Sequence, residues 1–172
     1  MVTLTIEREP ADTPDAIALL CARDAESNAL YPPHSQFHIP IDAHSEENII
    51  FVVAREGGEP VGCGALQVFC DYAELKSIYL VPAVRGRRLG ERIVEKLERI
   101  SRDLGRFDLK LETGVHSPAA IRTYERLGYR RCGRFGDYPD EPLSVFMEKR
   151  LQTACDSTIL APDPASAQET AG

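Results

Sequence analysis

An arginine- and glycine-rich turn lies between a strand-like segment that ends at Pro82 and a segment with helical apolar spacing. The turn reads Arg85-Gly86-Arg87-Arg88-Leu89-Gly90. Unpaired N–H groups at a helix N-terminus favour an anion, a glycine lets a ligand approach the backbone, and arginines add charge-assisted hydrogen bonds. The turn therefore predicts a pyrophosphate site, although a plain solvated turn has the same composition. A P-loop is excluded because the segment lacks G-x-x-x-x-G-K-[ST].

Several side chains could transfer protons. Glu74 and Glu112 lie in segments that alternate as strands do, and His116 has the side-chain pKa nearest to neutrality. Strand carboxylates commonly face solvent or form salt bridges, so a structural role is the alternative for both. The alternation predicts two faces for the first of these strands: one with Glu74, Lys76 and Ile78, the other with Leu75, Ser77 and Tyr79.

A long loop at residues 28–47 holds three of the four histidines and has no clear periodicity. Loops of this length in a compact domain are often functional. Tyr31, His34 and His38 could line a binding pocket there, or they could be incidental residues on a surface loop. No spacing of Asp, His or Cys is typical of a metal site, so no metal is expected.

Apolar spacing predicts how these residues are positioned. Strand patterns cover 2–8, 49–55, 61–69, 72–81 and 107–113, and two more, YRRCGRF and LSVFMEKRL, close the chain. Helix patterns cover 14–28, 89–104 and 117–127, and the first has Ile17, Leu20 and Cys21 at helical spacing. Thr13-Pro14 and Ser117-Pro118 each supply a cap followed by a proline. The order is a mixed α/β layout.

Length and composition narrow the class of protein. The chain has 172 residues, 43% of them hydrophobic, which suits one domain, here 1–151. The small, polar stretch 152–172 predicts a disordered tail. A net charge of -7 disfavours nucleic acid and anionic membranes as partners. Five cysteines without a C-x-x-C pair, and no apolar leader or long apolar run, predict a cytoplasmic protein in which Cys63 and Cys70 are small core residues.

Two motifs together resemble the GCN5-related N-acetyltransferase (GNAT) superfamily. The arginine-rich turn is similar to its acyl-CoA signature [QR]-x-x-G-x-[GA], with Arg88 where the first glycine is usual. The segment Ser117–Tyr129 resembles the later motif N-x-x-A-x-x-x-Y-x-x-x-G-[FY], with Ser117 in place of Asn. The resemblance spans about residues 2–150, and the segment RRCGRFGDYPDEPLSVFMEK is similar to a bacterial small-molecule subgroup.

The resemblance implies the GNAT fold, a mixed and mostly antiparallel sheet of about six or seven strands, flanked by helices and splayed between its fourth and fifth strands. It also implies acetyl-CoA as cosubstrate. In this fold the pantetheine arm pairs with the exposed backbone of the fourth strand, and the helix turn surrounds the pyrophosphate. The implied cofactor-binding residues are Ile78, Tyr79, Leu80, Arg85, Gly86, Arg87, Arg88, Leu89, Gly90 and Ser117.

The resemblance further implies direct acetyl transfer to a primary amine of a small molecule in a ternary complex. Tyr124 would protonate the leaving thiolate, although its helical spacing also suits a packed core tyrosine. Glu74, Glu112 or water would accept the amine proton.

The resemblance also implies a pocket for the acceptor, lined by Tyr31, His34 and His38. Acetylation of a protein Nα-amine or lysine is one alternative, and a non-catalytic acyl-CoA-binding module is the other. A homodimer is allowed, because proteins of this superfamily are frequently dimers.

Overall fold

The computed structural model describes residues 2–153. Most of the predicted tail, residues 154–172, lies outside the described residues. Within the described part, no helix combines the length and the apolar character that crossing a bilayer requires.

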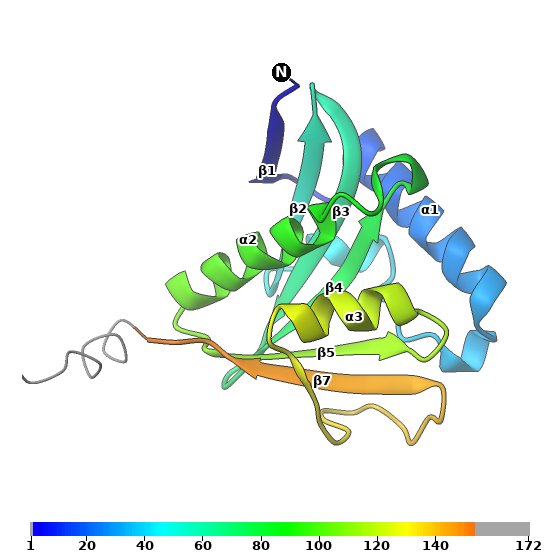
Figure 1. The fold of residues 1–172 in the computed structure, drawn as a ribbon, viewed down its shortest axis with the longest axis vertical. Helices are drawn as coiled ribbons and strands as arrows, with labels where there is room; N and C mark the ends of the chain where they lie inside the picture. The colour runs from blue at the N-terminus through cyan, green and yellow to red at the C-terminus, as the bar shows by residue number, and fades with distance from the viewer. Residues whose placement is uncertain (1, 154–172) are drawn as a thin grey trace, which may run out of the picture.

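A seven-stranded sheet forms the centre of the molecule, in the order β1-β2-β3-β4-β5-β7-β6 (Figure 1). Every neighbouring pair is antiparallel except β4 and β5, which are parallel. The strands are β1 (Leu4–Arg8), β2 (Ile49–Glu56), β3 (Glu59–Val68), β4 (Ala73–Leu80), β5 (Asp108–Gly114), β6 (Arg130–Arg131) and β7 (Ser144–Arg150). The helices are α1 (Pro14–Leu30), α2 (Leu89–Asp103) and α3 (Pro118–Arg126), with short 3-10 turns η1 (Pro33–Ser35), η2 (Asp42–Ser45) and η3 (Pro82–Val84).

Helices cover both faces of the sheet, so its central strands are buried on two sides. In β2, Val52 and Ala54 belong to the core that includes α2 and α3, whereas Phe51 and Val53 belong to the core that includes α1. Strands buried on both faces read as nearly continuous apolar runs, as the segment IIFVV does. The predicted mixed α/β domain is confirmed.

The buried face of α1 differs from the face that the spacing predicts. Ile17 and Cys21 are exposed, and the buried residues are Ala16, Leu19, Leu20 and Arg23. The helix is therefore rotated about its axis, and it brings a charged residue to the sheet. Arg23 occupies a core-facing position that an apolar side chain would normally take.

Strand β6 is much shorter than the predicted strand YRRCGRF. Arg130 and Arg131 pair with β7, and the Cys132 N–H donates to the Phe146 carbonyl at 2.9 Å just beyond them. The chain then leaves the ladder because Phe135 and Tyr138 turn back over the sheet and make edge-to-face contacts with Phe146, at ring-centroid distances of 5.5 and 5.3 Å. Aromatic packing thus replaces strand pairing in this segment.

A bulge in β4 changes which residues share a face. Ser77 has a left-handed backbone with φ of 56°, and the register with β3 shifts there. Leu75 and Ile78 consequently lie on the same face, that of α2, while Tyr79 packs against the α1 core. The prediction that Ile78 shares a face with Glu74 is wrong, because one extra residue in a bulge inverts the alternation.

Candidate active site

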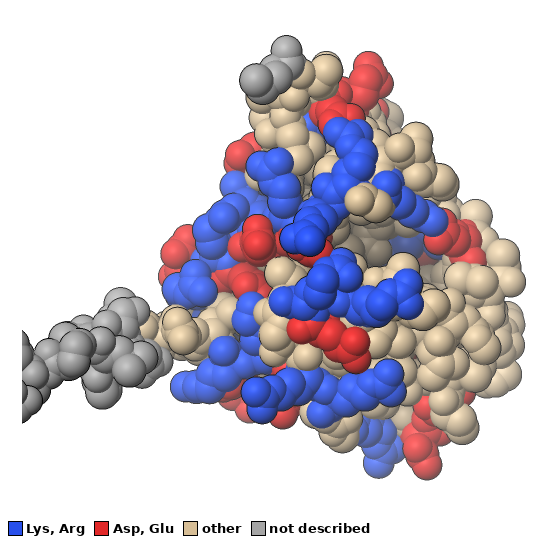
Figure 2. All heavy atoms as spheres, in the orientation of Figure 1, with Lys and Arg blue, Asp and Glu red and all other residues tan. Residues whose placement is uncertain are grey.

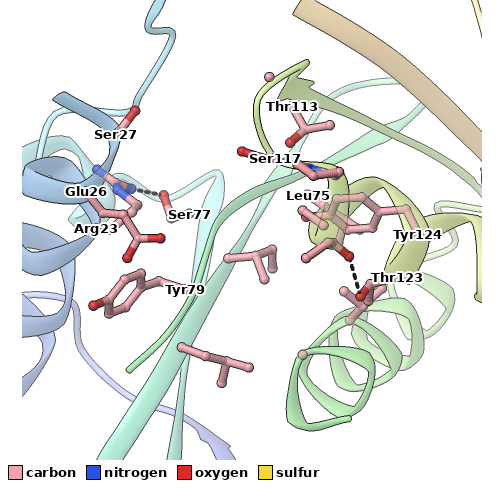
Figure 3. Close-up of a pocket in the computed structure, with 18 of the residues that line it drawn as sticks. Arg23, Glu26, Ser27, Leu75, Ser77, Tyr79, Thr113, Ser117, Thr123 and Tyr124 are labelled. Atoms are coloured by element: carbon pink, nitrogen blue, oxygen red, sulfur yellow. Dashed lines mark hydrogen bonds between the residues drawn. The ribbon is translucent and has the colours of Figure 1, made fainter. Parts of the chain in front are cut away.

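A cavity of about 820 Å³ lies where β4 and β5 part. The two strands pair over three residues only, ending at Leu75 and Leu111, and then diverge (Figure 1). The predicted splay is therefore present. Figure 3 shows the two walls: Arg23, Ser77 and Tyr79 lie on the side of α1 and β4, and Ser117 and Tyr124 lie across the cavity on the side of α3.

The arginine-rich turn forms one end of the cavity. Arg85, Gly86, Arg88, Leu89 and Gly90 all line it. Gly86 and Arg88 have φ values of 76° and 59°, so the backbone turns sharply before α2 begins at Leu89. A left-handed residue immediately before a helix directs free N–H groups into the concave side of the turn, which is how backbone anion sites are built.

The side chains of this turn differ in where they point. Arg85 lines the cavity, where its Nη2 lies 2.6 Å from the Glu26 carboxylate and 2.8 Å from the Leu80 carbonyl. Arg88 also lines the cavity, and its side chain forms no hydrogen bond or ion pair with another described residue, so its charge is available to a ligand. Arg87 is bound to Glu56 and does not line the cavity. Figure 2 shows basic side chains gathered beside the hollow, although the chain as a whole is acidic.

Tyr124 belongs to the core and also lines the cavity. Its ring packs in the core and makes an edge-to-face contact with Tyr129 at 5.8 Å, yet the residue also lines the cavity. The Tyr124 hydroxyl donates no hydrogen bond to any described residue. Burial, with a smaller contribution from Glu112, raises the pKa of this phenol, so it is protonated and able to donate at neutral pH.

Tyr31 lines the cavity beside the end of β5. It follows α1, and its hydroxyl lies 3.0 Å from the hydroxyl of Ser117 at the start of α3. A Cβ at Gly114 would overlap the Tyr31 ring, so only a glycine fits beneath it. His116 stacks on the Tyr31 ring, with the ring centroids 5.4 Å apart, and also lines the cavity.

The two candidate carboxylates have different surroundings. Glu74 is 3% exposed, accepts a hydrogen bond from the Tyr138 hydroxyl, lies 3.4 Å from Lys76 Nζ and does not line the cavity. Glu112 does line it, accepts a hydrogen bond of 2.6 Å from Ser144, and has its pKa raised by burial. Only Glu112 is therefore placed to meet a ligand.

The long loop reaches the cavity with only some of its candidate residues. His38 lines the cavity, and its Nδ1 lies 3.1 Å from Asp24 of α1. His34, in η1, is exposed and lies outside the cavity wall. The loop is held to β4 by Lys76, whose Nζ donates to the Phe37 carbonyl at 2.9 Å.

A buried hydrogen-bond chain holds the β4 bulge, and no motif pointed to it. Arg23 donates to the Ser77 hydroxyl. His44 Nδ1 lies 2.8 Å from the Pro40 carbonyl, which can only accept, so Nδ1 carries the proton. His44 Nε2, 2.8 Å from Ser77 Oγ, therefore accepts from the hydroxyl. The chain runs in one direction from Arg23 through Ser77 and His44 to Pro40, with His44 neutral because burial lowers its pKa.

Comparison with known proteins decides the family. Residues 16–129 match the model of the acetyltransferase (GNAT) family. The chain belongs to the GNAT acetyltransferase family. An IAA acetyltransferase of Azospirillum brasilense is 36% identical over 88% of this chain and all of its own length. A Klebsiella pneumoniae structure described as an acyl-CoA N-acyltransferase is 38% identical, covers 87% of this chain and 99% of its own, and has a TM-score of 0.75.

Structures of more distant GNAT proteins show the same fold with the cosubstrate in place. A GNAT acetyltransferase of Elizabethkingia anophelis, with acetyl-CoA bound, has a TM-score of 0.66 at 19% identity and covers 86% of this chain and 98% of its own. The relatives are acetyltransferases by name, and this GNAT chain is an acetyltransferase as well.

The backbone conformation explains one of the two departures of this GNAT enzyme from the family motif. Arg88 stands where a glycine is usual, and its φ of 59° is the left-handed conformation that glycine adopts most easily. The turn therefore keeps the backbone path that a glycine would give and carries an additional positive charge. At the second departure, the Ser117 hydroxyl forms a hydrogen bond with the Tyr31 hydroxyl, and Ser117 also lines the cavity.

Proposed function

We propose that the enzyme acetylates a primary amine of a small molecule, by direct attack of the amine on acetyl-CoA while both are bound. One observation carries the proposal: a single cavity joins the arginine-rich turn to the loop residues of the opposite end. Two substrates can therefore meet inside it without a covalent acyl-enzyme. No cysteine among the described residues lines the cavity. Cys63 is buried, and burial raises the pKa of its thiol to about 12. Cys70 is exposed, so the prediction that it is a core residue is wrong.

The β4 edge would hold the acyl group. Beyond Leu75 this edge has no partner in β5, so alternate backbone groups of Ile78, Tyr79 and Leu80 point to the cavity. In the mechanism proposed here, an N–H of this edge stabilises the oxyanion that forms on the thioester carbonyl. Tyr124 then protonates the departing CoA sulfur. Arg85, Arg88 and the turn N–H groups bind the pyrophosphate.

The position of Tyr31 favours a small acceptor. Its hydrogen bond to Ser117 links the end of α1 to the start of α3 and covers Gly114. A polypeptide acceptor would need a continuous groove across this link, whereas a small amine needs only the space beside it. This favours a small molecule over a protein Nα-amine or lysine. A homodimer and a cytoplasmic location stay predictions.

Thermal unfolding with acetyl-CoA, CoA and ADP tests the cosubstrate site first. A ligand at a hundredfold excess over its Kd stabilises the folded state by about 2.7 kcal/mol. We expect the wild type to be stabilised by acetyl-CoA and CoA, and Arg85→Ala to be stabilised less. Arg87→Ala is the matched control, because Arg87 belongs to the same turn but is bound to Glu56 outside the cavity.

An acceptor panel then tests the reaction. It compares small primary amines, lysine-containing peptides and IAA, after which the Azospirillum relative is named, by release of free CoA. Turnover with small amines and none with peptides is the expected result. Turnover with peptides alone would replace the proposal by protein acetylation, and binding without turnover on any acceptor would favour a non-catalytic acyl-CoA-binding module.

A further inference from the structure

We propose that His38, oriented by Asp24, is the general base that accepts the proton of the acceptor amine. The inference rests on the proposed amine acetylation and names the residue that this reaction still lacks. An attacking amine must lose a proton as its nitrogen bonds to the thioester carbon. The acceptor for that proton must reach the cavity, have a free lone pair and be uncharged at the working pH.

The Asp24 carboxylate determines which nitrogen of His38 is free. His38 Nδ1 lies 3.1 Å from Asp24 Oδ1. A carboxylate only accepts hydrogen bonds, so Nδ1 carries the proton and Nε2 has the lone pair. Nε2 makes no hydrogen bond to any described residue, and His38 lines the cavity. A histidine held by a carboxylate through one nitrogen, with the other nitrogen open, is the arrangement of general bases in many hydrolases.

Burial and two neighbouring positive charges keep His38 neutral. Burial lowers its pKa most, and Arg23 of α1 and Lys76 of β4 lower it further, while Asp24 opposes them. The pKa therefore lies below the usual 6.5, and the ring can accept a proton at pH 7. The side chain is 32% exposed, so the proton that it receives can pass to solvent.

The dyad is connected directly to the β4 bulge. Arg23 Nε donates to the same Asp24 oxygen at 2.8 Å, and another nitrogen of its guanidinium donates to the Ser77 hydroxyl. Figure 3 shows this Arg23–Ser77 contact at the cavity wall, opposite Tyr124. His38, Asp24 and Arg23 thus form one unit beside the strand edge that is proposed to hold the thioester.

The competing bases are less well placed. Glu74 is buried behind Tyr138 and does not line the cavity. Glu112 lines it, but one of its oxygens already accepts from Ser144. His116 is stacked on Tyr31 and forms no hydrogen bond or ion pair with a described carboxylate that would select its tautomer.

The proton and electron balance of the step is complete. The amine, having lost its first proton to solvent, bonds through nitrogen to the carbonyl carbon, and His38 Nε2 takes the second proton. The carbon–sulfur bond breaks with its electron pair on sulfur, and Tyr124 protonates that sulfur. His38 then releases its proton to solvent, and the Tyr124 phenolate takes one back.

The test compares two histidines of one loop. We expect His38→Gln to lower kcat about 100-fold and to leave the stabilisation by acetyl-CoA unchanged, since general-base catalysis contributes about 10²–10⁴-fold. His34→Gln, the matched control, changes an exposed residue outside the cavity and should keep full activity. His38→Ala should regain activity when free imidazole is added, which a purely structural residue would not.

The pH profile identifies the titrating group. A base must be deprotonated to act, so wild-type kcat should fall as the pH drops through the His38 pKa below 6.5. Asp24→Asn, which alters a positioning residue, should shift this acidic limb, and His38→Gln should remove it. Glu112→Gln should keep it.

Four outcomes would overturn the inference. They are full activity of His38→Gln, an equal loss in His34→Gln, no rescue by imidazole, and an acidic limb that disappears in Glu112→Gln instead. A wild-type enzyme that binds acetyl-CoA but acetylates no amine would overturn the proposed function and this inference with it. An enzyme that turns over amines equally well without His38 would overturn this inference alone.

Discussion

The two ends of the cavity are assembled in different ways. The end formed by the arginine-rich turn uses one contiguous segment, 85–90, together with α3. The opposite end brings together Arg23 and Asp24 from α1, His38 from the loop, and Ser77 from β4. Two of its contacts, Arg23 with Ser77 and Asp24 with His38, join residues from different elements, so both depend on the whole fold.

This difference indicates what each end is suited to do. A nucleotide pyrophosphate is the same ligand for every acetyl-CoA enzyme, and a short turn with backbone N–H groups can bind it through local geometry alone. An acceptor site must differ between enzymes, and side chains contributed by several elements allow that variation without altering the sheet. Substitutions at the two ends should therefore fail in different ways.

Tyr124→Phe should have the largest effect. Removing the phenolic hydroxyl deletes the proposed proton donor while the ring stays in the core, so kcat should fall about 100-fold, equivalent to about 2.7 kcal/mol in the activation barrier. Steady-state kinetics at saturating substrates measures this. Stability should change little, because the hydroxyl donates no hydrogen bond to any described residue.

Tyr129→Phe is the control for that variant. Tyr129 packs against Tyr124 but donates its hydroxyl to Glu98 at 2.9 Å and does not line the cavity. It should lose stability and keep kcat. Unchanged turnover in Tyr124→Phe would remove Tyr124 from the mechanism and leave it as a core residue.

Ser77 lies in the β4 bulge and also contributes to the opposite end of the cavity. Its substitution should therefore affect the structure of both. Ser77→Ala removes the hydroxyl between Arg23 and His44, which leaves buried polar groups without a partner. The free energy of unfolding should fall by about 1–3 kcal/mol. Chemical denaturation with unchanged m-values checks this.

Ser77→Gly separates two contributions to that loss. A glycine adopts φ of 56° easily and also lacks the hydroxyl, so it should be more stable than the alanine variant by about 1 kcal/mol. Equal stability of the two variants would show that the left-handed backbone costs nothing and that the hydroxyl alone matters.

The sequence predicted the end of the cavity formed by the arginine-rich turn well, and it predicted the opposite end poorly. The turn, the three helices and the splay follow from caps, apolar spacing and motifs, which are properties of neighbouring residues. Of Ile17, Leu20 and Cys21, which the apolar spacing selected, only Leu20 is buried, and a purely apolar pattern gave no weight to Arg23. The bulge at Ser77 likewise has no glycine to mark it, because tertiary hydrogen bonds hold its left-handed backbone. An arginine at core-facing spacing from Leu19 and Leu20 was the available signal for a buried functional charge.

Arg88→Gly should have the smallest effect. It should raise the stability of the free protein and weaken the binding of CoA. A glycine relieves the left-handed backbone at φ of 59°, which should raise the free energy of unfolding by about 1 kcal/mol without ligand. The same change removes a charge that lines the cavity, so the stabilisation by CoA should become smaller. Denaturation with and without CoA measures both quantities on one protein. If CoA stabilises the variant as much as the wild type, Arg88 makes no contact with the ligand, and the turn binds the pyrophosphate through its backbone and Arg85 alone.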